Sequence, residues 1–228
     1  MPQFYHKEVL QKGELGLWRI EEEESFFMDR LILTKEEKYQ IDTIKGRGRL
    51  EWLASRWLLH TLSGRATRGV CLKDEFGKPY LVDSPFQISI SHSQGEIAAV
   101  LAAPYAIGID IQKFVAKIQR IQHKFMRPIE MESLVESTHL EHLHIYWGAK
   151  ESLYKAYGRK QLDFKEHIFI TPFSFDLSNG ACTGIIHKGD YYKEFDIFYE
   201  KIEDYYLVYA LEKLGVRNQR TGVSDDRS

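Results

Sequence analysis

Two separated segments of the chain place ionisable residues where the surrounding pattern otherwise predicts buried core. The first segment, residues 107–112, carries Asp110, and the second, residues 147–156, carries Glu151 and Lys155. Magnesium ions in proteins are commonly held by one or two carboxylates together with waters and substrate phosphate oxygens. Two carboxylates and a lysine could therefore hold a hard cation against a phosphate group.

Each segment also has a pattern that predicts the element carrying it. In the first, isoleucines alternate with other residues, which predicts a strand with Asp110 and Gln112 on one face, about 6.6 Å apart. Residues 145–157 contain no proline and favour a helix, in which Glu151 and Lys155 lie one turn apart. Such a Glu–Lys pair is also consistent with an ordinary solvated helix pair. Asp110 is harder to explain as plain structure, because aspartate is depleted in strands.

Length and composition are those of a globular protein. The 228 residues could form one domain or two compact lobes, and the formal net charge of -2 gives no general attraction to nucleic acid or to an anionic membrane. The sequence has no basic-then-apolar signal pattern at its start and no apolar run long enough to span a bilayer, so we expect a cytoplasmic protein. Cys71 and Cys182 match no metal or redox spacing, and we expect both to be reduced.

The order of the predicted elements favours the α+β class. The opening third is predicted to be acidic and then helical, with a capping box that starts at Thr34 and a long amphipathic helix over 47–62. A strand over 86–93 and an apolar run over 97–103 predict a hairpin, and residues 113–157 read mainly as helices. Later strands are predicted over 168–170, 182–187, 195–199 and 205–211. The polar tail, residues 215–228, is expected to be disordered.

Several further side chains are candidate site residues by their chemistry. His139, His142 and His144 have no partner that completes a zinc pattern, so a partly exposed histidine group on a helix is favoured over a metal site. Ser91 and His92 are adjacent in a strand and point to opposite faces, which argues against a nucleophile and base pair.

Serine hydroxyls, an imidazole and the Lys78 amine can all donate to phosphate, so an anion contact fits this cluster better. For Arg47, Arg49 and Arg56 composition favours exposed surface residues over an anion patch.

Four motifs occur in the order and approximate spacing of one family. The chain closely resembles a 4′-phosphopantetheinyl transferase of the larger, pseudo-dimeric class, which activates peptide synthetases and other carrier proteins. The motifs that carry the resemblance are Gly77-Lys78-Pro79, Ile88-Ser89-Ile90-Ser91-His92-Ser93, Ile107-Gly108-Ile109-Asp110-Ile111-Gln112 and Trp147-Gly148-Ala149-Lys150-Glu151-Ser152-Leu153-Tyr154-Lys155-Ala156.

The resemblance implies a fold of two similar α+β lobes related by a pseudo-twofold, with coenzyme A in the cleft between them. We therefore expect an N-terminal lobe over 1–104 and a C-terminal lobe over 105–214. The implied reaction moves 4′-phosphopantetheine from coenzyme A to a serine hydroxyl of an apo acyl or peptidyl carrier protein and leaves adenosine 3′,5′-bisphosphate. A monomer with no nucleic-acid or membrane partner is expected.

The resemblance also assigns roles to residues. Asp110 and Glu151 would hold Mg²⁺, and Glu151 and Lys155 would be catalytic. Coenzyme A would be bound by Lys78, Ser89, Ser91, His92 and Lys155, with Arg47 or Arg49 reaching the 3′-phosphate. Many members of the class have a carboxylate where this chain has Gln112, so Gln112 would ligate the metal directly or through a water.

Two other functions remain open at this point. The first is a degenerate, non-catalytic module that binds coenzyme A or a carrier protein, and Gln112 is its only support in the sequence. The second is a Mg²⁺-dependent nucleotide phosphohydrolase that uses the same carboxylates.

Overall fold

The structure is a computed structural model that describes residues 3–214, and the tail predicted to be disordered lies outside the described residues. It contains two antiparallel sheets and several helices, which confirms the predicted mixture of α and β elements. Within residues 3–214, no helix has both the length and the apolar character that crossing a membrane requires. Cys71 and Cys182 are both free thiols, as predicted.

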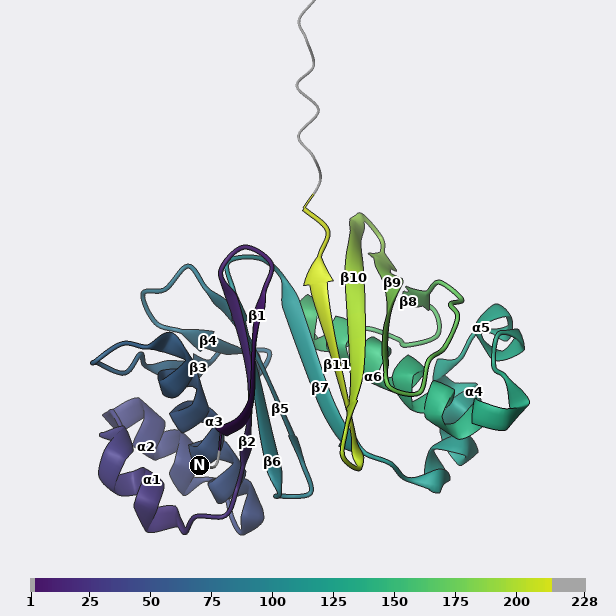
Figure 1. The fold of residues 1–228 in the computed structure, drawn as a ribbon. Coiled ribbons are helices and arrows are strands. Elements are labelled where there is room, and N and C mark those ends of the chain that lie inside the picture. The colour runs from purple at the N-terminus through teal and green to yellow at the C-terminus, as the bar shows by residue number, and fades with distance from the viewer. Residues whose placement is uncertain (1–2, 215–228) are drawn as a thin grey trace, which may run out of the picture.

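The first sheet and its helices occupy residues 3–103 (Figure 1). Its strands have the spatial order β1-β2-β6-β5-β4-β3. The elements are β1 (Gln3–Val9), β2 (Gly13–Arg19), α1 (Glu24–Leu31), α2 (Lys35–Asp42), α3 (Arg47–Ser63), β3 (Cys71–Lys73), β4 (Pro79–Leu81), β5 (Gln87–Ser93) and β6 (Ile97–Ala103).

The prediction for the opening third was wrong at its start, because β1 and β2 form an antiparallel hairpin before the first helix. β2 lies inside the sheet with both faces covered: Leu15 and Leu17 are buried on one side and Trp18 on the other. A strand buried on both faces loses the apolar–polar alternation by which strands are recognised. The Thr34 capping box and the predicted helix over 47–62 are both present, as α2 and α3.

The second sheet and its helices occupy residues 107–212. Its strands have the order β7-β11-β10-β9-β8, and β9 begins at Asn179, where the sequence predicted a turn. The elements are β7 (Ile107–Lys113), η1 (Ala116–Ile121), α4 (Gln122–Phe125), α5 (Pro128–Glu132), η2 (Glu136–Thr138), α6 (His139–Tyr157), β8 (Ile168–Ile170), β9 (Asn179–Lys188), β10 (Tyr191–Ile202) and β11 (Tyr205–Glu212).

Apart from β1, the two sheets are connected in the same way. Without β1, the strands of the first sheet lie in the order β2-β6-β5-β4-β3, and those of the second lie in the order β7-β11-β10-β9-β8. In both sheets the first strand along the chain is therefore next to the last, and the others follow in reverse order. In each case the longest helix, α3 or α6, lies between the first and second strands of the set.

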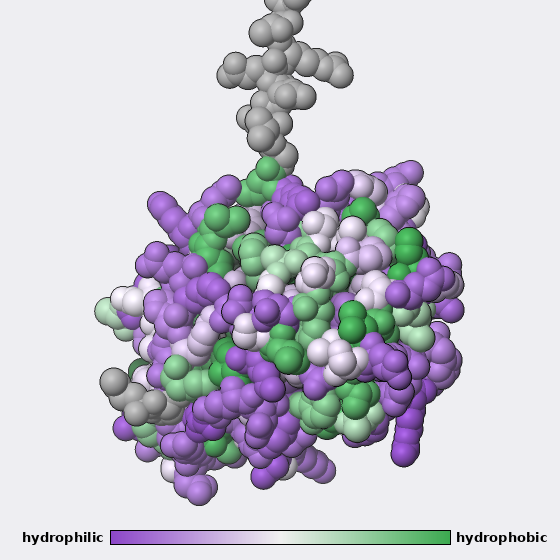
Figure 2. All heavy atoms as spheres, turned by 45° about the vertical axis from the view of Figure 1, so that its right-hand side comes forward, coloured by the Kyte–Doolittle hydropathy of each residue, from purple (hydrophilic) through white to green (hydrophobic). Residues whose placement is uncertain are grey.

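The sheets pack face to face, with helices on their outer faces (Figure 1). Apolar residues of β2 and β6 meet those of β7 and β11 in a core between the sheets. A second core lies between α1–α3 and the first sheet, and a third between α6 and the second sheet. Hydrophilic residues cover much of the face in Figure 2, with smaller hydrophobic patches among them.

Helix α6 approaches the second sheet closely at two glycines. A Cβ added to Gly108 of β7 would lie 1.8 Å from the Ser152 carbonyl oxygen, and one added to Gly148 of α6 would lie 2.6 Å from a methyl of Val208. The Ser152 hydroxyl donates to the Val208 carbonyl at 3.0 Å and joins helix to sheet. Glycine at these positions therefore sets how near α6 can lie to β7.

A fully buried ion pair fixes the other side of α6. Lys150 Nζ lies 2.7 Å from the Glu130 carboxylate, and both side chains are 0 % exposed. Lys150 also donates to the carbonyls of Phe164 and Ile168, and Glu130 accepts from the Ile170 amide. Breaking such a pair would leave an unpaired buried charge, so Lys150 is a structural member of the motif rather than a site residue.

The histidines at the start of α6 are not the partly exposed group that was predicted, since His142 and His144 are both fully buried. His142 stacks on Tyr146 and Phe175 and contacts the edge of Phe173. In the part of the chain that the structure describes, neither ring nitrogen of His142 has a hydrogen-bond partner, and burial lowers the pKa of His142 to about 4.

We predict that Gly108→Ala destabilises the fold, because the new methyl group cannot fit against the helix backbone. Overpacking of this kind costs about 2 kcal/mol or more in the free energy of unfolding, measured by urea denaturation. Gly48→Ala is the control, since its Cβ would meet only the flexible Ile44 side chain, at 3.2 Å. Equal stability of Gly108→Ala and the wild type would contradict the close approach.

We also predict that protonation of His142 contributes to acid denaturation. Because the pKa of His142 in the folded state lies below its ordinary value of 6.5, the unfolded chain binds the proton more tightly. Stability is therefore complete above pH 6.5 and falls by about 3 kcal/mol as the pH drops to 4.

His142→Phe, which keeps the stacking, should flatten this part of the pH–stability curve. His123→Phe, at an exposed position, should leave the curve as in the wild type. An unchanged curve in His142→Phe would show that other groups cause the acid sensitivity.

Candidate functional site

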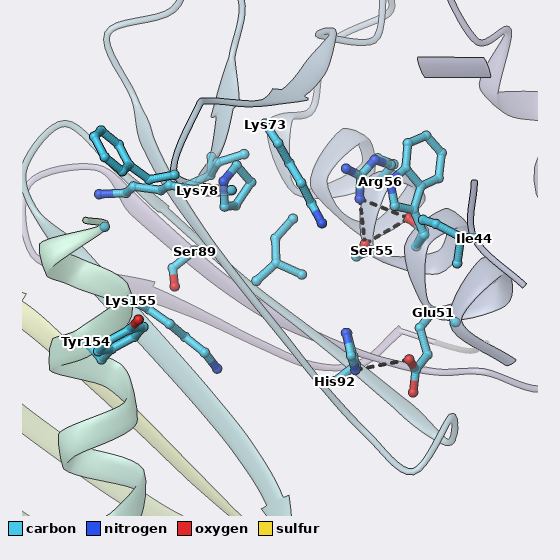
Figure 3. Close-up of a pocket in the computed structure, with 18 of the residues that line it drawn as sticks. Ile44, Glu51, Ser55, Arg56, Lys73, Lys78, Ser89, His92, Tyr154 and Lys155 are labelled. Carbon is cyan, nitrogen blue, oxygen red and sulfur yellow. Dashed lines mark hydrogen bonds and ion pairs between the residues drawn. The ribbon is translucent and has the colours of Figure 1, made fainter. Parts of the chain in front are cut away.

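A cleft of about 520 Å³ lies between elements of both halves of the chain (Figure 3). Helix α3 and strand β5 form one wall, the segment from Lys73 to Pro79 covers it, and the C-terminal end of α6 forms the opposite wall. Its charged lining is mainly basic and consists of Arg56, Lys73, Lys78, Lys155, Arg159 and Lys160, with Glu51 and His92. Clustered positive charge in a concave site concentrates anionic ligands.

Asp110 and Lys155 meet beside this cleft. Lys155 Nζ lies 2.9 Å from Asp110 Oδ1, and it also donates to the Ser91 hydroxyl and to the Ile109 carbonyl, each at 2.9 Å. The Ser91 hydroxyl in turn donates to Asp110 Oδ1 at 3.1 Å. Strand β7, helix α6 and strand β5 thus contribute one residue each to a charged network, and Lys155 connects this network to the cleft that it lines.

Glu151, one helical turn before Lys155, is the second carboxylate of this region. Burial raises the pKa of Glu151 to about 7, and the negative charge of Asp110 raises it further, while Lys155 lowers it. Within residues 3–214, no hydrogen bond or ion pair occupies the Glu151 carboxylate. Two carboxylates that repel each other beside one lysine have the donor chemistry for a divalent cation.

The protein donors for such a cation are few. In the described part of the chain, no group of three or more His, Cys, Asp or Glu side chains could hold a metal ion. Two carboxylates suit Mg²⁺, which keeps several waters and takes the remaining oxygens from a substrate phosphate.

Gln112 faces helix α6 through specific hydrogen bonds. Its Nε2 donates to the His144 carbonyl at 3.0 Å, and its Oε1 lies 3.1 Å from His144 Nδ1. His144 Nε2 lies 3.1 Å from the Val115 amide nitrogen and 3.2 Å from the Val115 carbonyl oxygen. Burial lowers the pKa of His144 and favours the neutral ring. Both ends of the Gln112 amide are therefore occupied within the fold.

The structure brings together most of the residues expected to bind coenzyme A. Lys78, Ser89, His92 and Lys155 line the cleft, whereas Ser91 does not. Lys78 Nζ donates to the Ala156 carbonyl at 3.1 Å, and burial lowers the pKa of Lys78. The Lys78 amine therefore spans from the first half of the chain to the end of α6.

His92 lies on the opposite side of the cleft, with its Nδ1 3.1 Å from the Glu51 carboxylate. Figure 3 shows this pair at the end of the cleft away from Lys78. Glu51 was not among the residues singled out in the sequence, because nothing in its neighbourhood marks it as more than a polar position on a helix.

Arg47 and Arg49 do not line the cleft. Arg49 is paired with Glu24 at 2.6 Å and also donates to the Ile41 carbonyl. Arg47 donates to the Gln94 carbonyl in the turn between β5 and β6. Both arginines therefore support the fold around the cleft in this structure.

Of the three arginines singled out in the sequence, Arg56 lines the cleft, and the expectation that it is a surface residue was wrong. It is 3 % exposed, its guanidinium lies 3.7 Å above the Trp52 ring, and two of its nitrogens, Nε and Nη2, have no hydrogen-bond partner among the described residues. A buried cation without a carboxylate partner is costly unless an anion satisfies it. Its position among the apolar residues of α3 was the signal in the sequence that a composition-based judgement missed.

We predict that Gln112→Glu lowers stability. A carboxylate cannot donate to the His144 carbonyl, so two acceptors would face each other in a partly buried position. The loss should be about 1 to 2 kcal/mol in the free energy of unfolding, measured by urea denaturation near pH 7. Gln119→Glu, an exposed position, is the matched control. A Gln112→Glu protein as stable as the control would show that the hydrogen bonds to His144 contribute nothing.

Comparison with known proteins agrees with this geometry. No curated protein matches the chain. Residues 106–210 match the family model of the 4′-phosphopantetheinyl transferase superfamily, and this stretch contains Asp110, Gln112, Glu151 and Lys155, so the match supports a transferase that handles phosphopantetheine.

Proposed function

We propose that this protein transfers 4′-phosphopantetheine from coenzyme A to a serine hydroxyl of an apo acyl or peptidyl carrier protein. The observation that carries the proposal is the meeting of Asp110, Glu151 and Lys155 beside a basic cleft, within the segment that matches the family model. Coenzyme A carries a diphosphate and a 3′-phosphate, so a cleft rich in lysine and arginine suits it. Adenosine 3′,5′-bisphosphate would be the second product.

Asp110 and Glu151 would hold the Mg²⁺ ion. Their fit is supported by the Glu151 carboxylate, which has no partner within residues 3–214 and lies in the repulsive field of Asp110. The ion, when bound, would neutralise charge on the diphosphate and orient it. Gln112 contributes no ligand in this proposal, since His144 occupies both ends of its amide.

The remaining chemistry belongs to side chains of the chain itself. The carrier serine oxygen attacks the β-phosphorus of coenzyme A, and the bond from that phosphorus to the bridging oxygen breaks. Glu151, or a water it holds, accepts the serine proton. Lys155 donates to the phosphate oxygens, because its amine is already directed to this region by Ser91 and by the Ile109 carbonyl.

The basic lining would hold the nucleotide end. Lys78 and His92 lie on opposite sides of the cleft, and Arg56 adds a buried positive charge to its lining. Binding at several points fixes the diphosphate relative to the attacking serine, which is how phosphoryl transfer enzymes lower their barrier.

The predicted organisation in two lobes remains part of this proposal. It is supported by the repeated strand order of the two sheets, which divide between Ala103 and Ile107, near the expected boundary at residue 104. We propose a monomer, since the cleft draws its walls from both halves of a single chain. A cytoplasmic location, expected from the sequence, is also part of the proposal.

The test is a mass measurement on the acceptor. Incubation of the protein with coenzyme A, Mg²⁺ and a panel of apo carrier proteins should add one phosphopantetheine group to at least one carrier, and a chelator should prevent it. No addition to any carrier, together with tight binding of coenzyme A, would instead indicate a binding module. Release of nucleotide without a carrier would indicate a phosphohydrolase.

We predict that Asp110→Asn and Glu151→Gln each reduce transfer at least about 100-fold, because each removes a charged oxygen ligand or the base. The circular dichroism spectrum should be unchanged. Glu166→Gln, an exposed carboxylate in the following loop, is the control and should transfer at the wild-type rate. Wild-type transfer by Asp110→Asn would rule out the assigned metal ligands.

A further inference from the structure

Three serines of β5 contact the outer edge of β7 in a regular series. The Ile109 amide donates to the Ser89 hydroxyl at 3.1 Å, the Ile111 amide to Ser91 at 3.2 Å, and the Lys113 amide to Ser93 at 3.2 Å. The donor is in each case the residue 20 positions after the serine. The constant offset means that β5 and β7 run in the same direction. We call these three contacts the serine ladder.

The serine ladder supplies hydrogen-bond acceptors for amides of β7 that have no partner within the second sheet. β7 is one of the two outer strands of the second sheet, and within residues 3–214 it pairs with β11 alone. The amides on its other edge therefore lack strand partners, yet this edge is buried against β5 and β6. A buried backbone N–H without an acceptor is costly. Serine hydroxyls on alternate residues of β5 supply the acceptors at the spacing of a strand.

The middle member of the ladder has no capacity left for a ligand. A hydroxyl has one proton to donate and two lone pairs. Ser91 donates to Asp110 Oδ1 and accepts from the Ile111 amide and from Lys155 Nζ. Ser91 is 6 % exposed and does not line the cleft.

We propose that Ser91 and Ser93 are positioning residues and that the serine ladder sets the register between the two sheets. By holding β7 to β5, the ladder fixes Asp110 relative to the cleft, and the Ser91 hydroxyl orients its carboxylate. Ser91 does not bind phosphate. This assignment differs from the role that the resemblance implied for Ser91.

Amide hydrogen exchange tests the ladder without reference to activity. In the wild type, the amides of Ile109, Ile111 and Lys113 should exchange slowly although they lie on an outer strand. Ser93→Ala should accelerate exchange at Lys113 about tenfold or more and leave Ile109 unchanged. Ser93→Thr, which retains the hydroxyl, should restore protection. Equal exchange at Lys113 in Ser93→Ala and in the wild type would overturn the ladder.

Binding measurements test the role of Ser91, and only this part depends on the proposed function. Mn²⁺ alone is titrated into the protein, and the signal of the unbound Mn²⁺ is followed by electron paramagnetic resonance. Ser91→Ala should weaken Mn²⁺ binding about tenfold or more, because residues that hydrogen-bond a metal ligand tune its affinity to this extent. Affinity for coenzyme A without metal, measured by calorimetry, should fall far less than in Lys78→Ala, because the Asp110 carboxylate and the Ile109 carbonyl still hold the Lys155 amine.

The controls separate the possible failures. Lys78→Ala should weaken coenzyme A and leave Mn²⁺ binding unchanged, and Ser63→Ala, an exposed serine, should change neither. If Ser91→Ala weakens coenzyme A as Lys78→Ala does, Ser91 is a phosphate ligand and the proposal is wrong. If the wild type binds no Mn²⁺, the metal site of the proposed function fails, while hydrogen exchange still decides the ladder. Melting temperatures identify any variant that fails to fold. Ser91→Thr, which retains the hydroxyl, should bind Mn²⁺ as the wild type does.

Discussion

The structure depends on how the outer edge of β7 is satisfied. This strand belongs to the second sheet, is packed against the first sheet, and carries Asp110. An outer strand has unpaired backbone groups, which proteins must cover or expose to water. Here β5 hydroxyls accept from the amides, and the Lys155 amine donates to the Ile109 carbonyl. The same contacts that complete the backbone bonding of β7 thus assemble the charged network beside the cleft.

Elements that depend on a local sequence pattern were predicted correctly. The alternation around Asp110, the apolar spacing of α3 and the capping box at Thr34 each reflect neighbours along the chain, and each predicted its element. β2 was missed because both its faces are buried, which removes the alternation.

Tertiary contacts could not be predicted from such local patterns. The amide of Gln112 meets His144, 32 residues away, and the cation of Arg56 is buried by the packing of α3. A composition-based judgement places an arginine at the surface because most arginines lie there. The sequence was enough to single out Asp110, Glu151 and Lys155 as candidate site residues. The residues that contact them are determined by packing and could not be predicted.

The serine ladder also bears on the order of folding. A chain is made from its N-terminus, and its earlier parts can fold before the later ones are complete. The hydroxyls of β5 belong to the part made first, and β7 needs them as acceptors along its outer edge. The first sheet can therefore act as a template on which β7 docks, and the remaining strands of the second sheet would add to β7 afterwards. Contacts between the halves would then form early, although they join segments that are distant along the chain.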